Sequence, residues 1–499
     1  ELQDNKDRLL AVTTFDKNVV VTAGAGTGKT TLLVDRITHL LMREPEPLRI
    51  TDIIAITFTK KAANEMKIRL RGRLQYFIDR VTKGLSDEKT SYEDKLLCDI
   101  MQRYSLSLNQ IAERASNAIN NMEKAQIGTI HGFAGHILRL YPLEAGLDPD
   151  FEEDDGSLFD EHFEREWEEW LDMELSSNPP HGETWKDILR KVSLDKVEIL
   201  AKDLCRETIP VSSLKNEITR ELLNSKLVSW LEQEMNKAQA LLDQYEGVRK
   251  VKMHDLLRKT IDVLNDLSAG IHVSYFNDNI PTKSPRDWLE NDYNEAVRIV
   301  SIAQGLSTAD DSFIQKLIEL ILPFASSFRR KFVISGNTSF DGLLSFCCNL
   351  LKNKVNIRNY LKNHFKSILV DEFQDTDPLQ YEIILYLAEI EGKHETDWRG
   401  IKLTPGKIFI VGDPKQSIYA FRGADIEAYH KVVDMIVEQG GVIANLSTNF
   451  RSNNGIINVV NSMCRRIIRA RDHLQPEYVD IIACPGHEAL KPVQRVELR

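Results

Sequence analysis

The chain has 499 residues, a formal net charge of −11 and a hydrophobic fraction of 42%. This length exceeds what one hydrophobic core supports, so we expect two to four domains, and no apolar run approaches the roughly 18–20 residues of a membrane span. Six scattered cysteines without a C-x-x-C pair, and no cleavable signal before the first predicted strand, predict reduced thiols in a cytoplasmic protein with no membrane partner.

The charge is unevenly distributed along the chain. Residues 60–73, KKAANEMKIRLRGR, carry six basic side chains against one acidic side chain, whereas residues 152–174 are almost wholly acidic. A negative net charge argues against nucleic acid as a partner only when the charge is evenly spread. The basic segment therefore leaves nucleic acid open as a partner.

The first part of the chain alternates between predicted strands and predicted helices. An apolar run at 19–22 enters a glycine turn before a helix around 32–41, and a β-branched run at 53–58 precedes the basic helix. Residues 74–124 are polar and have a helical pattern. Such alternation predicts an α/β fold with a parallel sheet covered by helices.

The pattern changes between about 145 and 335. Large apolar residues recur at helical spacing there, as at Phe159, Phe163 and Trp167, and strand signals are nearly absent. This pattern predicts an all-helical domain inserted into the α/β domain, with the aromatic stripe as its core. Further strands are predicted at Ser367–Val370, Lys407–Val411 and Val442–Leu446. The predicted sheet is thus assembled from two separated blocks of sequence.

The segment AGAGTGKT after the first predicted strand has the pattern of a phosphate-binding loop. Its glycines allow backbone N–H groups to surround phosphates, and the following helix presents its positive N-terminus. Lys29 is predicted to neutralise the β- and γ-phosphate oxygens, and the Thr30 hydroxyl to bind Mg²⁺. This pattern alone leaves a kinase, a GTPase, a transporter motor and a helicase open. The predicted ATP-binding residues are Ala23, Gly24, Ala25, Gly26, Thr27, Gly28, Lys29, Thr30 and Thr31.

Later strand ends add acidic, amide and arginine side chains. The apolar strand 367–370 delivers Asp371 and Glu372 to the carboxyl edge of the sheet, on a strand expected to neighbour the phosphate loop. We expect Asp371 to hold Mg²⁺ through water and Glu372 to orient and deprotonate the attacking water, because paired acids are costly there without a cation. Gln416 is predicted to contact the γ-phosphate. In the segment STNFRS, Arg451 is predicted to neutralise γ-phosphate charge and Phe450 to stack on adenine.

Taken together and in this order, the motifs resemble those of the UvrD/Rep-type helicases. They are AGAGTGKT, ITFTKKAANEM, GTIHGF, VDEFQDTD, GDPKQSIYAFRGAD and LSTNFRS. VDEFQDTDPLQ, GDPKQSIYAFRGAD and the segment SFDGLL before them look most like the AddA/RecB branch. The resemblance implies a RecA-like phosphate-loop ATPase domain 1A at 1–144 and 336–475. It also implies a helical domain 1B at 145–335 and a lead-in at 476–499 to a second RecA-like domain.

The resemblance also implies contacts to single-stranded DNA or to a single-strand/double-strand junction. Hydroxyls and amides suit phosphates, and aromatic rings suit exposed bases. Gln374, together with Gln416, would connect the γ-phosphate to this DNA-facing side. A second helicase–nuclease subunit is a further expected partner. The implied DNA-binding residues are Thr57, Phe58, Thr59, Lys60, Thr129, His131, Phe133, Tyr419, Phe421 and Arg422.

Three departures from the family pattern bear on function. Arg8 stands where the family has a glutamine that contacts the adenine edge, which leaves adenine selectivity to Phe450. Lys60 stands where asparagine is common. The second RecA-like domain with its arginine finger, worth roughly 10³–10⁵ in rate, is not within the 499 residues.

We therefore expect this chain alone to bind ATP, Mg²⁺ and DNA but to hydrolyse slowly and not to unwind DNA. The alternative is a non-catalytic DNA-binding module that a partner chain completes. Intact Lys29, Asp371, Glu372 and Arg451 favour the ATPase, and the DEFQ and TIHGF segments together disfavour a kinase or a transporter ATPase.

Overall fold

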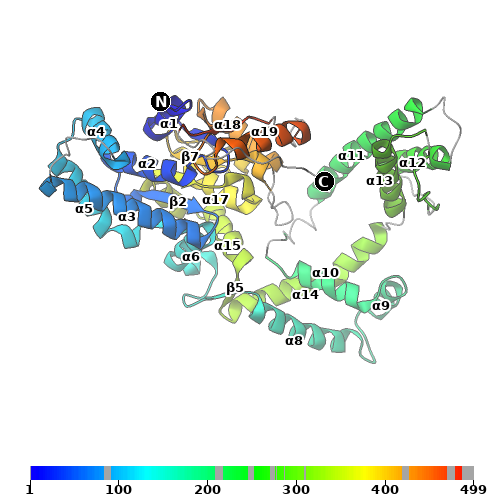
Figure 1. Cartoon of the computed structure of the whole chain (residues 1–499). Coiled ribbons are helices and arrows are strands. Elements are labelled where there is room, and N and C mark those ends of the chain that lie inside the picture. The colour runs from blue at the N-terminus through cyan, green and yellow to red at the C-terminus, as the bar shows by residue number, and fades with distance from the viewer. Residues whose placement is uncertain are drawn as a thin grey trace. The chain divides into compact units, whose positions relative to one another are not determined.

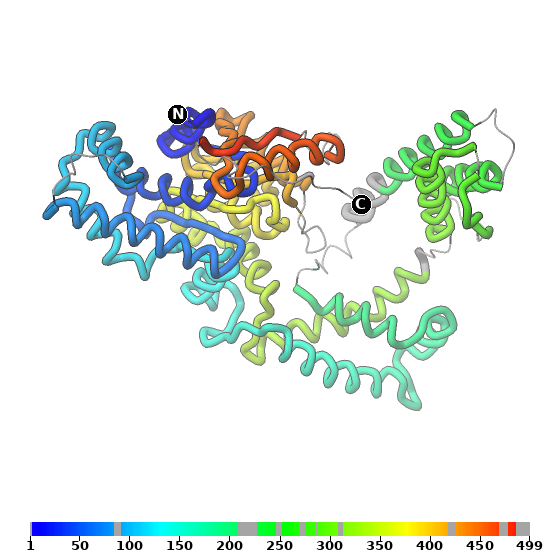
Figure 2. The backbone as a smooth tube through the Cα atoms, in the orientation of Figure 1, coloured from blue at the N-terminus to red at the C-terminus, as the bar shows by residue number. Residues whose placement is uncertain are grey.

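The chain forms two compact units, Glu1–Glu153 with Phe340–Arg499, and Asp154–Ser339 (Figure 1). The computed structural model describes residues 2–83, 91–207, 209, 217–245, 252–269, 276, 278–285, 287–307, 311–417, 426–468 and 478–485. Blue and cyan segments intermix with yellow, orange and red segments in the first unit (Figure 2). The first unit is thus built from two distant blocks of sequence.

A six-stranded sheet forms the centre of the first unit. Its strand order is β3-β2-β6-β7-β1-β8, and each neighbouring pair runs parallel. Because the strands are parallel, their carboxyl ends lie at one edge of the sheet. The strands are β1 (Val19–Ala23), β2 (Ile53–Thr57), β3 (Gln126–Thr129), β6 (Ser367–Val370), β7 (Ile408–Gly412) and β8 (Val442–Leu446).

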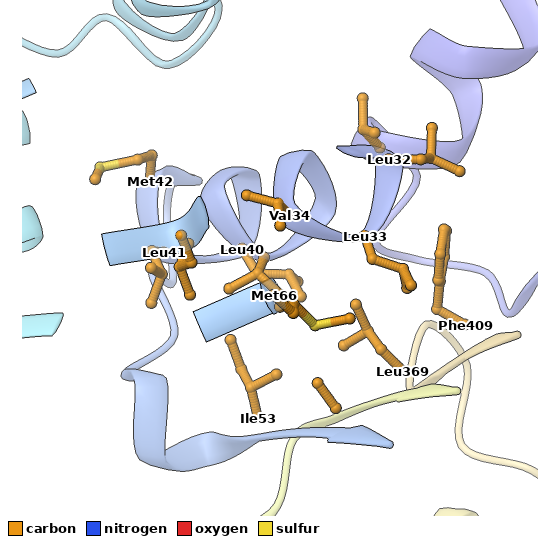
Figure 3. Packing of buried hydrophobic residues seen from close by; sticks show 14 of the residues in the cluster. Leu32, Leu33, Val34, Leu40, Leu41, Met42, Ile53, Met66, Leu369 and Phe409 are labelled. Carbon is orange, nitrogen blue, oxygen red and sulfur yellow. The ribbon is translucent and has the colours of Figure 1, made fainter. Parts of the chain in front are cut away.

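The residues of the inner strands explain why helices cover both faces of the sheet. All the residues of β2, β6 and β7 are buried, so their aliphatic side chains need apolar partners on both sides. Leu33, Leu40, Ile53, Leu369 and Phe409 belong to one such core cluster (Figure 3). The helices of this unit are α1 (Asn5–Thr13), α2 (Lys29–Met42), α3 (Lys60–Lys83), α4 (Tyr92–Tyr104), α5 (Leu108–Asn120), α6 (Ile130–Leu140), α7 (Pro142–Ala145), α15 (Phe340–Asn353), α16 (Val355–His364), α17 (Pro378–Ala388), α18 (Ile426–Glu438) and α19 (Asn454–Ile467).

Short elements complete the first unit. β9 (Thr448–Asn449) pairs in parallel with β10 (Ile482–Ala483), and β4 (Glu152–Asp154) begins where the chain leaves this unit. Short 3₁₀ turns follow two central strands at Phe373–Asp375 and Pro414–Gln416. Both turns therefore start from the carboxyl edge of the sheet.

The second unit, taken by itself, is made largely of helices. Phe159, Phe163 and Trp167 are buried in one apolar cluster, while a second cluster gathers residues of the three helices α11–α13. β5 (Asn337–Ser339) ends the unit. Its helices are α8 (Ser157–Glu174), α9 (Gly182–Leu189), α10 (Leu194–Leu204), α11 (Glu217–Gln244), α12 (Lys252–Ser268), α13 (Glu290–Ser307) and α14 (Asp311–Ile334).

Five strands of the six-stranded sheet were predicted to within one residue at each end, whereas its edge strand β3 and the short strands β4, β5, β9 and β10 were not predicted. The β3 sequence QIGT has neither a β-branched run nor strict alternation, and it occupies the edge of the sheet. This segment therefore forms a strand because it pairs with β2, and not because its residues favour a strand. Among the helices that the structure describes, none combines the length and the apolar character needed to cross a membrane.

Candidate nucleotide site at the carboxyl edge of the sheet

The phosphate loop connects β1 to α2. Gly26 and Gly28 have φ angles of 76° and 85°, a left-handed conformation that favours glycine. The Thr27 hydroxyl donates to the Gly24 carbonyl oxygen at 2.8 Å and closes the loop on itself. α2 then begins at Lys29. The loop thus places a helix N-terminus beside a glycine-rich turn, an arrangement that suits anion binding.

Residues 447–452 hold the phosphate loop from the other side. The Asn449 side-chain amide donates to the Ala25 carbonyl oxygen at 2.6 Å, and the Phe450 backbone amide donates to the Gly26 carbonyl oxygen at 2.8 Å. A Cβ atom on Gly26 would lie 2.6 Å from the Asn449 nitrogen. Gly26 is therefore needed both for its φ angle and for this close approach.

Phe450 and Arg451 are both exposed beside the phosphate loop. The Phe450 side chain is 38% exposed, and the Arg451 backbone amide donates to the Asn449 side-chain oxygen at 2.9 Å. Asn449 therefore orients Arg451, which was predicted to contact the γ-phosphate. Asn449 was missed as a site residue, although it lies within the recognised LSTNFRS segment.

The acidic pair follows β6. In the sheet, β7 lies between β6 and β1, so the expectation that the acidic strand is a direct neighbour of the phosphate-loop strand was wrong. Asp371 is buried, and burial, followed by the nearby Glu372 carboxylate, raises its pKa to about 6. Glu372 has a φ of 50°, and its Oε2 accepts a hydrogen bond from the Lys29 ammonium at 2.6 Å. The phosphate-loop lysine is thus paired with the predicted general base.

A chain of hydrogen bonds continues from this pair. The Gln374 amide nitrogen donates to Glu372 Oε2 at 2.9 Å, and the Gln374 Oε1 accepts from the Asp413 backbone amide at 2.9 Å. The Gln416 amide then donates to Asp413 Oδ2 at 2.7 Å. Lys29, Glu372, Gln374, Asp413 and Gln416 are therefore linked in sequence across three loops. Asp413 is a second residue that the sequence analysis did not single out.

The donor set fits a magnesium ion that keeps most of its ligands as water and phosphate. Asp371 is a buried carboxylate with a raised pKa, and Thr30 supplies a hydroxyl in the first turn of α2. Within the described parts of the chain, no group of three or more His, Cys, Asp or Glu side chains could form a full protein cage for a metal. This sparse set suits Mg²⁺ bound together with a nucleotide.

Arg8 reaches the phosphate loop from α1. Its guanidinium forms two hydrogen bonds to Asp4 and a third, at 2.9 Å, to the Thr27 carbonyl oxygen. Its Cζ lies 5.0 Å from the centroid of the Phe450 ring. Arg8, which departs from the family pattern, therefore lies beside Phe450, the residue predicted to stack on adenine.

Two of the segments predicted to bind DNA meet at the same edge. Thr57 at the end of β2 and Thr129 at the end of β3 are register partners in the sheet. Phe58 is 39% exposed, and Thr59 and Lys60 are exposed at the start of α3. This edge brings together hydroxyl, aromatic and basic side chains.

The remaining predicted DNA residues differ in accessibility. The half-buried His131 ring packs 4.9 Å from Phe340, and burial lowers its pKa. Phe133 is 4% exposed and packs edge-to-face on Phe365, so it contributes to the core in this conformation. The predicted residues Tyr419, Phe421 and Arg422 lie outside the described residues.

A phosphate loop and an acidic pair on strands of one parallel sheet define an α/β nucleoside-triphosphate-binding protein. A model of the UvrD/REP helicase N-terminal domain matches residues 4–435, so the chain belongs to this family. This membership and the relatives described next confirm the resemblance to UvrD/Rep-type helicases and to their AddA/RecB branch.

The chain is similar to curated proteins named as the A subunit of an ATP-dependent helicase/nuclease. It is 25% identical to that of Bacillus cereus (strain B4264) over 93% of this chain and 39% of the relative. It is 26% identical to that of Clostridium botulinum (strain Alaska E43 / Type E3) over 96% and 40%, and 24% identical to that of Bacillus pumilus (strain SAFR-032) over 93% and 39%. The chain thus spans about two fifths of the length of these relatives.

Proposed function

We propose that this chain is the ATP-binding portion of a DNA helicase that moves along single-stranded DNA and acts in DNA repair and recombination. The observation that carries this proposal is the chain of contacts from Lys29 through Glu372, Gln374 and Asp413 to Gln416. It joins the phosphate loop to two loops that the family places between the nucleotide and the DNA.

The contacts suggest how nucleotide binding changes the site. Lys29 neutralises phosphate oxygens only after it leaves Glu372, so the arriving phosphates and the Glu372 carboxylate compete for one ammonium. Once released, Glu372 accepts a proton from the attacking water, and Arg451 stabilises γ-phosphate charge. Mg²⁺, when bound near Thr30 and Asp371, neutralises charge on the phosphates.

Gln374 is placed to transmit this change. Because it is hydrogen-bonded to both Glu372 and Asp413, movement of the Glu372 carboxylate alters the loop that carries Gln416. Directional movement along DNA requires that contacts to DNA differ between the nucleotide-bound and nucleotide-free states. We propose that the loop that carries Gln416 provides that difference.

We assign the first unit to a RecA-like domain 1A and the second unit to the inserted helical domain 1B. Residues 476–499 would lead to a second RecA-like domain. DNA binding is proposed for the β2 and β3 ends, where Phe58 and His131 offer rings and Thr129 and Lys60 offer polar groups. Thr57 is buried, and its hydroxyl donates to the Thr59 carbonyl oxygen at 3.0 Å, so it shapes the β2 end rather than facing DNA. All six cysteines are free thiols, which supports a place in the cytoplasm.

A DNA-stimulated ATPase assay tests the proposal. The 499-residue chain is expected to bind MgATP and single-stranded DNA and to hydrolyse ATP slowly, with stimulation by DNA. Lys29→Ala removes nucleotide binding, whereas Lys17→Ala, an exposed lysine at the other end of β1, leaves it unchanged. Nucleotide binding that survives Lys29→Ala would refute the proposed site, and robust strand separation by this chain alone would refute the expected low activity.

The alternative, a non-catalytic DNA-binding module completed by a partner chain, is distinguished by Glu372→Gln. In an ATPase this variant binds MgATP and loses the DNA-stimulated hydrolysis. In a non-catalytic module, neither the wild type nor the variant hydrolyses ATP. A second helicase–nuclease subunit is the partner we propose, because the relatives are named as one subunit of a helicase/nuclease.

A further inference from the structure

Arg8 lies where the base of a nucleotide would bind in the proposed site, and its hydrogen bonds use only two of the three guanidinium nitrogens. Arg8 Nε donates to Asp4 Oδ1 at 3.0 Å, and Arg8 Nη2 donates to Asp4 Oδ2 at 2.9 Å, to the Thr27 carbonyl at 2.9 Å and to the Thr448 carbonyl at 3.4 Å. Among the described residues, the structure shows no hydrogen-bond acceptor for Nη1. This nitrogen lies 3.7 Å from the position of a Cβ built on Gly28. Two N–H donors therefore remain at the start of α2.

Phe450 borders the same place. Its Cδ2 and Cε2 atoms are also 3.7 Å from the Cβ position on Gly28, and the guanidinium of Arg8 lies over the ring. Because Phe450 is 38% exposed, an aromatic base can stack on the part of the ring that Arg8 leaves uncovered. A base stacked there would bring its edge towards Arg8 Nη1, which lies beside the same ring atoms.

Arg8 presents only donors to that edge. A guanidinium stays protonated and has no acceptor, whereas a glutamine amide has both a donor and an acceptor. Asp4 cannot supply the missing acceptor, because it is 5% exposed and already accepts from the Ser447 amide and from the amide and hydroxyl of Thr448. The structure thus places donors, and no free carboxylate, beside the base.

Purine edges respond differently to a pair of donors. Guanine presents N7 and O6, which both accept, whereas adenine presents an N7 acceptor beside an N6 amino donor. A donor placed against the N6 amino group leaves two N–H groups unsatisfied. Arginine accordingly pairs with guanine edges and glutamine with adenine edges.

We propose that Arg8 makes this nucleotide site accept guanine and other 6-oxopurine nucleotides at least as well as adenine nucleotides. The inference rests on the proposed nucleotide site and concerns only its choice of base. Arg8 is also a positioning residue, since it joins α1 to the phosphate loop through Thr27 and to residue 448 through the Asp4 carboxylate. Loss of Arg8 thus affects all nucleotides alike, whereas its effect on base choice appears in the ratio of affinities.

Calorimetric titrations of the 499-residue chain with MgADP, MgGDP and MgIDP test this inference. IDP carries O6 without the guanine amino group, so it isolates the effect of the 6-oxo group. MgGDP and MgIDP are expected to bind as tightly as MgADP or more tightly. Adenine binding tenfold tighter than both would overturn the inference without the need for any variant.

Arg8→Gln supplies the second measurement. The ratio of GDP to ADP dissociation constants is expected to shift roughly tenfold or more towards ADP. Lys6→Gln, an exposed neighbour on α1, is expected to leave the ratio unchanged. An unchanged ratio in Arg8→Gln, or an equal shift in Lys6→Gln, would overturn the inference.

The two proposals fail in different ways. If Lys29→Ala leaves diphosphate binding intact, the proposed nucleotide site itself is wrong. If Lys29→Ala removes binding of every nucleotide while the wild type rejects GDP and IDP, the site stands and only the role of Arg8 is wrong.

Discussion

Asp371→Asn is expected to make the nucleotide-free protein more stable at neutral pH. Burial and the adjacent Glu372 carboxylate raise the pKa of Asp371 from 3.8 to about 6. The folded state therefore binds more protons than the unfolded state between these values, and the free energy of unfolding falls as pH rises through this window. Two pKa units at 1.36 kcal/mol each correspond to about 3 kcal/mol lost above pH 6. Asparagine has no charge to bury, and its oxygen can still accept the Glu372 amide hydrogen bond.

The assay compares melting curves of wild type and Asp371→Asn at pH 4 and pH 8. For a unit of about 300 residues, 3 kcal/mol corresponds to roughly 4–5 °C. The difference is expected to be close to zero at pH 4 and to reach this value at pH 8, because other titrating groups cancel between the two proteins. The relevant transition is the one that MgADP shifts, which identifies the unit that carries the phosphate loop.

Nucleotide nearly cancels this difference in stability. At a ligand concentration 100 times the dissociation constant, binding stabilises the wild type by about 2.7 kcal/mol. Asp371→Asn is expected to gain much less from MgADP, since it lacks the carboxylate proposed to hold Mg²⁺. The reasoning is refuted if the nucleotide-free variant is no more stable than the wild type at pH 8, or if the difference does not depend on pH.

Three further substitutions test the phosphate loop, the connection through Gln374 and a buried ion cluster elsewhere in the first unit. Gly26→Ala is expected to weaken nucleotide binding at least tenfold, because its Cβ would lie 2.6 Å from the side-chain nitrogen of Asn449. Gly146→Ala is the control for backbone strain alone, since Gly146 has a φ of 78° and a Cβ there would have no atom within 4 Å. Gln374→Ala should retain nucleotide binding measured by calorimetry but lose stimulation of ATP hydrolysis by DNA. Glu389→Ala should lower the free energy of unfolding, measured in urea, by about 3–5 kcal/mol, because it leaves the buried cations Arg358 and Lys362 unpaired.

Each of these expectations has an outcome that contradicts it. Equal losses of affinity in Gly26→Ala and Gly146→Ala would show that close approach is unimportant. DNA stimulation retained by Gln374→Ala would remove this residue from the connection between sites. Glu391→Ala, an exposed neighbour, is the control for Glu389→Ala, and equal effects of the two on unfolding would contradict the role given to the buried cluster.

Local sequence was enough to predict the phosphate loop and five of the six strands of the central sheet. The left-handed glycines, the helix that begins at Lys29 and the apolar run before them are all set by residues within a few positions of one another. The acidic pair was found for the same reason, since it directly follows a buried strand. Such features depend on backbone sterics and burial, which short segments reveal.

The tertiary structure alone decided which loops meet. Strand order placed β7 between the phosphate loop and the acidic pair and paired the ends of β2 and β3, because a parallel crossover returns to a sheet position that local sequence does not encode. The contact of Asn449 with Ala25, the pairing of Lys29 with Glu372 and the position of Arg8 beside Phe450 each join residues hundreds of positions apart. These long-range contacts show how the recognised motifs interact. They place Arg8, which departs from the family pattern, beside Phe450, and this position leads to a testable prediction about which base the site prefers.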